Sequence, residues 1–240
     1  MARIVGRPCS YLPLATDVFR FSPLPGHPPR FIDVCNIGRR SPITHDALME
    51  IARGRRMFYY YDTVASSGAR QKQRTFRVSN ASEHRLLFAS LLQRSRYYIA
   101  NRSRVNEPEY TMGRDEISSR FYEGAASGAV MLGEPPRSEE FERQFDWPDA
   151  VIRLPFDSPD VGRVLLELDE DPTRLARIRR DNVYNAVLRH DWVHRLRTVF
   201  ETLGISPTEA MLAREAQLKA LGALALEAWA GEDRPGRPAP

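Results

Sequence analysis

The sequence predicts an α/β domain with a parallel, Rossmann-like sheet that helices cover on both faces. The first observation is a series of short apolar runs, each followed by a stretch with helical periodicity and helix-capping residues. The second is the composition: 240 residues, 42% hydrophobic and 28% charged, suffice for a buried core and are ordinary for a globular protein. Ligands bind such sheets at the carboxyl ends of the strands. The loops after Ile37, Ala100 and Leu132 are therefore expected to form the ligand-binding edge.

The first strand and helix show this pattern most clearly. Residues 31–37 form an apolar run that ends at Gly38, which is typical of a buried parallel strand followed by a tight turn. Ser41 and Pro42 then provide a capping hydroxyl and a proline in the first helical turn. Gly54 is expected to end this helix.

The other elements follow the same rhythm along the chain. Further strands are expected at 57–61, 97–100, 129–132 and 150–154, and helices at 83–94, 118–127, after Asp160, after Pro172 and at 207–229. The sequence thus divides into an entry segment (1–29), the Rossmann-like domain (30–204), a C-terminal helix (205–230) and a disordered tail (231–240). Six prolines interrupt the entry segment, and prolines and glycines fill the tail.

Charge and cysteine content exclude several classes of protein. The net charge of +4 fits an anionic small ligand but lacks the concentrated basic block of a strong nucleic-acid binder. Nearly all cations are arginine, whose planar fork suits phosphate, although arginine-rich codon usage explains the same bias. Cys9 and Cys35 have neither metal-site nor redox spacing. We find no apolar stretch typical of a signal peptide or a membrane span, so a cytoplasmic protein without a transmembrane segment is expected.

The most informative stretch covers residues 114–132. Small residues at 124–126 allow a helix to approach a neighbouring backbone closely, and Glu123 follows Arg120 by about one turn. Gly128 is expected to end the helix directly before a strand. The helix N-terminus would lie at the ligand edge of the sheet, where its free N–H groups favour phosphate or another anion.

This stretch resembles the signature of retaining GT-B glycosyltransferases. An acidic residue, Asp115, is followed by seven residues, then Glu123, small residues, a glycine and an apolar strand. The order Arg-Phe-x-Glu is most similar to the branch with the CgeB-like C-terminal domain. Similar segments elsewhere extend the resemblance over most of the chain: residues 12–17 with Phe21 and Pro23, residues 33–39, and His190 with residues 194–196.

The resemblance implies a role for each matching residue. Glu123 would accept hydrogen bonds from both ribose hydroxyls of the donor nucleotide, and Arg120 lies beside it in the donor site. Asp115 takes the place of the acid that faces the donor sugar, where the family usually has Glu. Gly38 forms the glycine turn, and Arg39 matches the position of an arginine that binds the diphosphate.

Other features of the family pattern are met only in part. The family's second cation has no clear match, although Arg102 and Arg104 are candidates. Arg40 adjoins Arg39, and a solvated surface position is the alternative for either arginine. No metal or other cofactor is expected, because GT-B enzymes stabilise the leaving diphosphate without a bound metal. The chain begins where the second GT-B domain would begin, so an N-terminal partner domain or chain is expected.

The resemblance implies transfer of a sugar from a nucleotide-diphosphate sugar to an unidentified acceptor, a saccharide, protein or small molecule. Retention of the anomeric configuration is implied as well. Two alternatives belong to other classes. One is a non-catalytic module that binds a nucleotide or a nucleotide sugar, and the other is a nucleic-acid-associated α/β protein, whose binding would fall steeply with salt.

Several candidate residues have structural interpretations as well. Glu123 could be a surface residue paired with Arg120. His190 and His194 lie one turn apart, as in some metal pairs, but no third ligand is apparent, so packing or capping in one long helix is expected. The acidic run 169–171 is expected to be a solvated turn.

Overall fold

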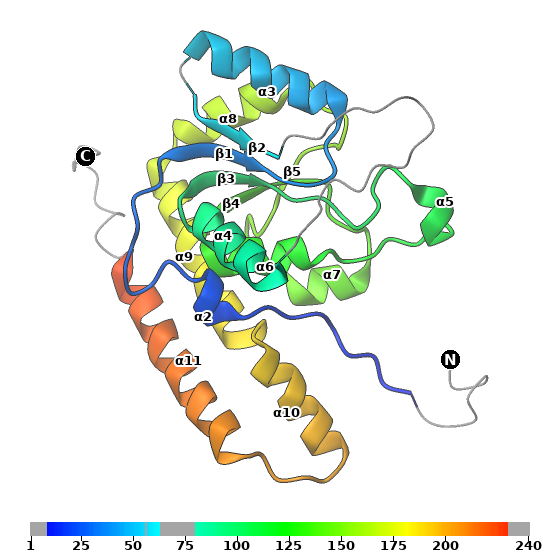
Figure 1. Ribbon diagram of the computed structural model, residues 1–240, viewed down its shortest axis with the longest axis vertical. Coiled ribbons are helices and arrows are strands. Elements are labelled where there is room, and N and C mark those ends of the chain that lie inside the picture. Colours follow the sequence, from blue (N-terminus) through cyan, green and yellow to red (C-terminus); the bar gives the residue numbers. More distant parts are fainter. Residues whose placement is uncertain (1–8, 56, 63–79, 230–240) are drawn as a thin grey trace.

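The computed structural model describes residues 9–55, 57–62 and 80–229. Five parallel strands form one sheet in the order β2-β1-β3-β4-β5, with helices on both faces (Figure 1). The strands are β1 (Ile32–Asn36), β2 (Tyr59–Tyr61), β3 (Ser95–Ile99), β4 (Val130–Gly133) and β5 (Ile152–Arg153). This confirms the predicted fold class. The tail predicted to be disordered, residues 231–240, lies outside the described residues.

The strand order contains one reversal. From β1 the chain moves outward to β2, then returns across β1 to β3 and continues to β4 and β5. Val34 of β1 is accordingly paired with Tyr59 on one side and with Tyr97 on the other. Connections leave in opposite directions at such a reversal, and the strand ends between them form a crevice where ligands bind.

The helices build two cores, one on each face of the sheet. They are α2 (Val18–Phe21), α3 (Pro42–Arg55), α4 (Ala81–Gln93), α5 (Pro108–Thr111), α6 (Ser119–Ser127), α7 (Glu139–Gln144), α8 (Val161–Asp169), α9 (Pro172–Arg189), α10 (Trp192–Thr202) and α11 (Glu209–Ala228). Strand β3 shows the division: Tyr97 and Ile99 pack in the core with α3 and α8, whereas Tyr98 packs in the core with α4 and α6. This is the alternation that a strand buried on both faces requires.

Local capping follows the sequence at most helix ends. The Ser41 hydroxyl accepts a hydrogen bond from the backbone N–H of Thr44 at 3.2 Å, and Ser118 caps α6. Gly128 ends α6 with a left-handed φ of 66°. The prediction that Gly54 ends its helix is wrong, because α3 continues to Arg55 and the glycine is tolerated one residue before the helix end.

The chain also breaks between α9 and α10, where one long helix was expected. His190 is the C-cap of α9, and Asp191 is the N-cap of α10, so His190 and His194 do not share a helix. The carboxylate of Asp191 is fully buried and accepts from the backbone N–H groups of Val193 and Val18 at 3.0 Å and from Arg214 at 2.7 Å. These bonds stabilise the break because they tie α2, α10 and α11 to one point.

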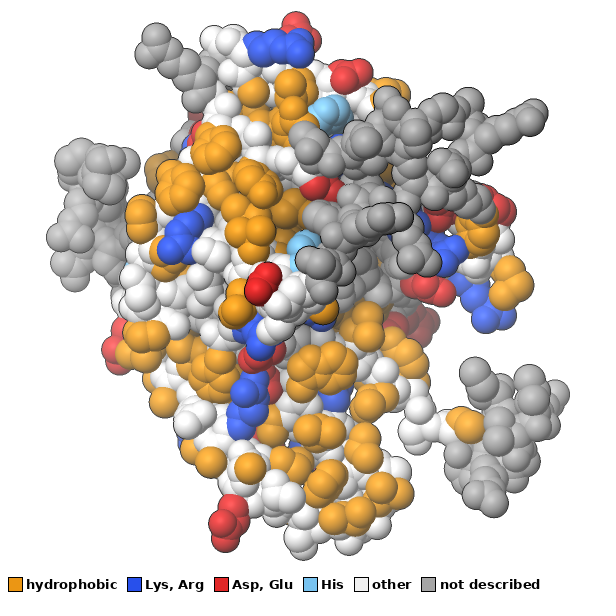
Figure 2. Space-filling view, in the orientation of Figure 1, with side chains coloured by type: hydrophobic (Ala, Val, Ile, Leu, Met, Phe, Trp, Pro, Cys, Tyr) orange, Lys and Arg blue, Asp and Glu red, His pale blue; other side chains and the backbone are white. Residues whose placement is uncertain are grey.

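Helices α10 and α11 form a hairpin that extends from the sheet domain (Figure 1). Hydrophobic side chains gather over this part of the molecule in the space-filling view (Figure 2). The exposed ones of the hairpin include Trp192, Leu196, Leu203, Ile205 and Leu212. Within the described part of the chain, no helix combines the length and apolar character needed to cross a bilayer.

The entry segment contributes to the core. Ala15, Val18, Phe21 and Leu24 are buried, and α2 packs against α4 and α6. The segment therefore helps to position the two helices that form the site described next.

Candidate functional site

A cavity of about 850 Å³ opens at the carboxyl ends of β1 and β3. It lies at the reversal of strand order, between the turn after β1, the loop after β3 and the helices α4 and α6. The loops after Ile37 and Ala100 line it as predicted, whereas the loop after Leu132 does not. The residues that line it are Ile37, Gly38, Arg39, His84, Arg85, Phe88, Ile99, Asn101, Arg102, Ser103, Arg104, Val105, Asn106, Glu107, Tyr110, Ser118, Ser119, Arg120 and Glu123.

Close packing of α6 against the sheet places Glu123 in the cavity wall. A Cβ atom added at Gly124 would lie 2.5 Å from Sδ of Met131 and 3.1 Å from a ring carbon of Tyr98. A larger residue would therefore push the helix away from the sheet. Glu123, the preceding residue, is only 4% exposed.

The carboxylate of Glu123 is bound by a residue from the opposite wall. Arg85 of α4 donates a hydrogen bond to Oε1, and the Ser119 hydroxyl lies 3.5 Å from Oε2. Burial raises the pKa of Glu123, while the charges of Arg85 and Arg120 oppose the shift. The interpretation as a surface residue paired with Arg120 is wrong, because Glu123 is buried and its ion-pair partner is Arg85.

Arg120 braces the turn after β1. Its guanidinium donates to the backbone carbonyl of Ile37 and to the Tyr98 hydroxyl, the latter at 3.2 Å. Gly38 has a φ of 93°, and a Cβ atom there would lie 2.1 Å from Nη2 of Arg120. The left-handed backbone conformation favours glycine here, and a Cβ atom would force the Arg120 guanidinium to shift.

The two arginines after Gly38 point to different environments. Arg40 bonds to the carboxylate and backbone carbonyl of Asp62 and lies over the Tyr61 ring. The Arg39 side chain is 46% exposed, lines the cavity and forms an ion pair with Glu107 at 2.8 Å. Arg39 is thus the arginine of the pair that can reach a ligand.

Asp115 lies outside the lining of the cavity. Its carboxylate pairs with Arg102 at 3.3 Å and accepts a hydrogen bond from the backbone N–H of Arg137 at 2.9 Å. Arg102 itself lines the cavity and also pairs with Glu134. Arg104, the other candidate for the second cation, lies over the Tyr110 ring with its Cζ 5.0 Å from the ring centre.

Within the described residues, no group of three or more His, Cys, Asp or Glu side chains is arranged to hold a metal ion. Asp169 accepts from the Tyr97 hydroxyl and from Arg96, and Asp171 caps α9 through the backbone N–H of Arg174. The acidic run therefore joins two helices and fixes the start of a strand, which goes beyond the solvated turn that was expected.

His190 is a packing residue. Its ring is completely buried among Tyr122, Phe145 and Trp147. Burial lowers its pKa to about 3, and the nearby charges of Arg195 and Arg189 act in the same direction. The ring is therefore neutral at physiological pH.

The sequence model of the glycosyl transferase-like family matches residues 47–201. This match covers most of the domain, from α3 to α10, and includes the α4 and α6 walls of the cavity. The chain belongs to this family. No curated protein matches the chain.

The family match confirms the resemblance to glycosyltransferases at the level of the family. The structure brings Gly38, Arg39, Arg120 and Glu123 together around one cavity, although Gly38 and Arg39 precede the matched region. Arg85 was missed by the sequence analysis. It lies 38 residues before Glu123, its side chain is half exposed, and no motif marks it.

Proposed function

We propose that this chain is the donor-binding domain of a GT-B glycosyltransferase of the CgeB-like branch. It would transfer a sugar from a nucleotide-diphosphate sugar to an acceptor, with retention of the anomeric configuration. One observation supports this most. Glu123, which the family pattern assigns to the donor ribose, is a buried carboxylate in the wall of a basic cavity at the reversal of strand order.

The charge of the cavity suits a diphosphate. Five arginines line it against two carboxylates, Glu107 and Glu123. The N-terminus of α6 also opens on the cavity at Ser118 and Ser119, so its backbone N–H groups favour an anion there. Negative charge that develops on the leaving diphosphate would meet donors already in place, which is the most effective form of electrostatic catalysis.

The positions of Glu123, Arg39 and Arg120 support the roles that we propose for them. Glu123 accepts the ribose hydroxyls, Arg39 binds the diphosphate, and Arg120 with Gly38 holds the turn that carries Arg39. Asp115 keeps the position of the sugar-facing acid in the family pattern. Asp115 is paired with Arg102. A direct contact between Asp115 and the sugar would therefore break this ion pair and first change the bonding of Arg102.

The acceptor is expected to bind elsewhere. GT-B enzymes place the reaction between two domains, so we propose that an N-terminal partner domain or another chain supplies the acceptor site. The exposed hydrophobic side chains of the α10–α11 hairpin are consistent with a contact to such a partner.

The test is a calorimetric and thermal-shift screen against UDP, GDP, TDP and their common sugars. Wild type, Glu123→Gln and a control, Glu167→Gln, would be compared; Glu167 is an exposed carboxylate paired with Arg163 on α8. At 100 times its dissociation constant, one diphosphate should stabilise the protein by about 2.7 kcal/mol. Glu123→Gln should lower the affinity for the nucleoside diphosphate relative to that for inorganic pyrophosphate, and the control should leave this ratio unchanged.

The outcomes separate the alternatives. Binding of a nucleotide sugar together with release of its sugar to water or to an added acceptor supports the transferase. Binding without release of the sugar, also in the presence of a partner domain, favours the non-catalytic module. Failure of folded wild-type protein to bind any of these compounds contradicts both interpretations.

A further inference from the structure

The ion pair between Arg85 and Glu123 crosses the proposed donor site. Arg85 reaches from α4 to the carboxylate on α6, and both residues line the cavity. The Arg85 side chain is 51% exposed, whereas that of Glu123 is 5% exposed. The carboxylate is therefore fixed by its surroundings, while the arginine has room to move.

The hydrogen-bonded partners of the other cavity arginines are groups other than the carboxylate that we assign to the donor ribose. Arg120 bonds to the Ile37 carbonyl and the Tyr98 hydroxyl, and Arg102 bonds to Asp115 and Glu134. Arg39 is paired with Glu107 nearer the surface. Among the described cavity arginines, Arg85 is the one whose hydrogen bond occupies the carboxylate assigned to the ligand.

We propose that Arg85 is a phosphate-binding residue that changes partner when a nucleoside diphosphate enters the cavity. The ribose hydroxyls take over the Glu123 carboxylate, and the released guanidinium turns to the diphosphate. This inference rests on the proposed function of the same site. A guanidinium binds carboxylate and phosphate through the same fork of donors, so the exchange keeps its hydrogen bonds.

The exchange links the two halves of the ligand. A nucleoside alone must displace Arg85 without offering it a new partner, and pyrophosphate alone must take Arg85 from Glu123 without satisfying the carboxylate. The complete nucleoside diphosphate satisfies both groups at once. The nucleoside and pyrophosphate should therefore each bind more weakly than the contacts of the same group in the complete nucleoside diphosphate would indicate.

Calorimetric titration with inorganic pyrophosphate tests this exchange without the ribose. Four proteins are compared: wild type, Glu123→Gln, Arg85→Ala and the double variant. Glu123→Gln should tighten pyrophosphate binding by about tenfold, because the arginine is freed, and Arg85→Ala should weaken it by about tenfold. In the Arg85→Ala background, Glu123→Gln should tighten binding by much less than tenfold, because only the general effect of the lost charge is left.

A second carboxylate of the cavity provides the matched control. Glu107→Gln also removes a negative charge, but it frees Arg39, so its effect on pyrophosphate binding should be the same with and without Arg85. Equal tightening by Glu123→Gln in both backgrounds would reveal only a general charge effect and would overturn the exchange. The same holds if pyrophosphate fails to bind Glu123→Gln.

The proposed function can fail separately from this inference. Wild-type protein that binds no nucleoside diphosphate overturns both proposals. Wild-type protein that binds one, while the substitutions at 85 and 123 act independently on pyrophosphate, overturns only the exchange. Arg85→Ala leaves the buried Glu123 carboxylate without its ion-pair partner, so its unfolding temperature should fall, and a cooperative unfolding transition would confirm that the variant is folded.

Discussion

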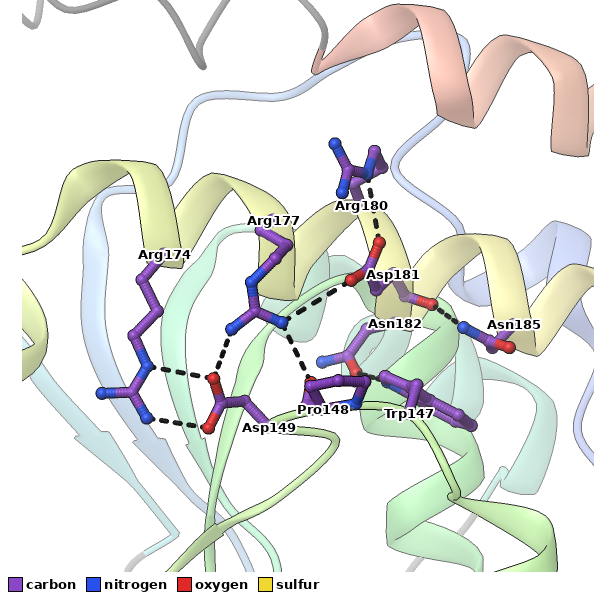
Figure 3. A network of polar contacts seen from close by, with 9 residues as sticks. All are labelled: Trp147, Pro148, Asp149, Arg174, Arg177, Arg180, Asp181, Asn182 and Asn185. Carbon is purple, nitrogen blue, oxygen red and sulfur yellow. Dashed lines mark hydrogen bonds and ion pairs between the residues drawn. The ribbon is translucent and has the colours of Figure 1, made fainter.

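Two clusters of arginines in this protein both form ion pairs with carboxylates, but they lie in different surroundings. One lies along the first turns of α9 and faces the loop before β5 (Figure 3). There Arg174 makes two hydrogen bonds to Asp149, at 2.7 and 3.0 Å, and Arg177 bonds to the same carboxylate. Arg180 pairs with Asp181. Arg174 and Arg177 join the helix to the loop through Asp149, whereas the Arg180–Asp181 pair lies within the helix.

The arginines of the cavity are arranged differently. They line a cavity, and two of their ion pairs, Arg39–Glu107 and Arg85–Glu123, join different walls of it. The comparison shows that the number of arginines does not indicate a ligand site. What matters is whether their partners are fixed parts of the fold or groups that a ligand can replace.

The largest effect is expected at a cavity residue that behaves as part of the fold. Arg120→Met would leave the Ile37 carbonyl and the Tyr98 hydroxyl without their donor and the Gly38 turn without its brace. We expect a loss of about 3 kcal/mol in the free energy of unfolding, together with loss of diphosphate binding. Urea unfolding and calorimetry would measure both, with Arg163→Ala as an exposed control. Retained stability would show that the turn does not depend on this arginine.

The second effect should separate the two clusters. Asp149→Asn removes the charge that Arg174 and Arg177 share, and we expect a loss of about 1–2 kcal/mol in unfolding free energy without any change in diphosphate affinity. The hydrogen bond from Arg174, opposed by burial and aided by Arg177, lowers the pKa of Asp149. The stability it contributes is therefore present above the ordinary pKa of an aspartate and is lost as the pH falls below it.

Acid unfolding of wild type and Asp149→Asn would measure this contribution. The two curves should converge at low pH, where the wild-type carboxylate is protonated. A change in diphosphate affinity in Asp149→Asn would contradict the separation of the two clusters.

The fold could be predicted from the sequence because its signals are local. Apolar runs located all five strands, and capping residues such as Ser41, Ser118 and Gly128 located helix ends. The break at Asp191 was missed, although Asp191 caps the next helix through the nearby Val193 N–H; its contacts with Val18 and Arg214 are distant in the sequence. Strand order likewise depends on the packing of whole elements.

The residues of the candidate site that belong to a sequence motif could be predicted. Glu123 and Arg120 share one helix, and the glycine turn with Arg39 follows a recognisable strand. Arg85 was not predictable, because its partner across the cavity is set by how α4 and α6 pack against the sheet. The function of Asp115 stays a prediction. An experiment that tests it must change the ion pair between Asp115 and Arg102.

The third effect tests an arginine whose partner a ligand can replace. Arg39→Ala breaks an exposed ion pair, so the unfolding free energy should change by less than about 0.5 kcal/mol. Diphosphate affinity should fall by about tenfold, which corresponds to roughly 1.4 kcal/mol. Calorimetry on Arg39→Ala and on Arg163→Ala, an arginine paired on the surface of α8, would show the difference. Equal affinities of the two variants would place Arg39 with the structural arginines.

The smallest effect concerns the protonation of Glu123. Because burial raises its pKa in the folded protein, the stability linked to this group is fully present below the ordinary pKa of a glutamate and decreases as the pH rises. Wild type should therefore lose stability relative to Glu123→Gln as the pH is raised from about 4 to neutral. This is the opposite slope to that of Asp149. Urea unfolding of wild type and Glu123→Gln over this pH range would measure the difference. A wild-type stability that rises with pH relative to Glu123→Gln would contradict the raised pKa of the buried carboxylate.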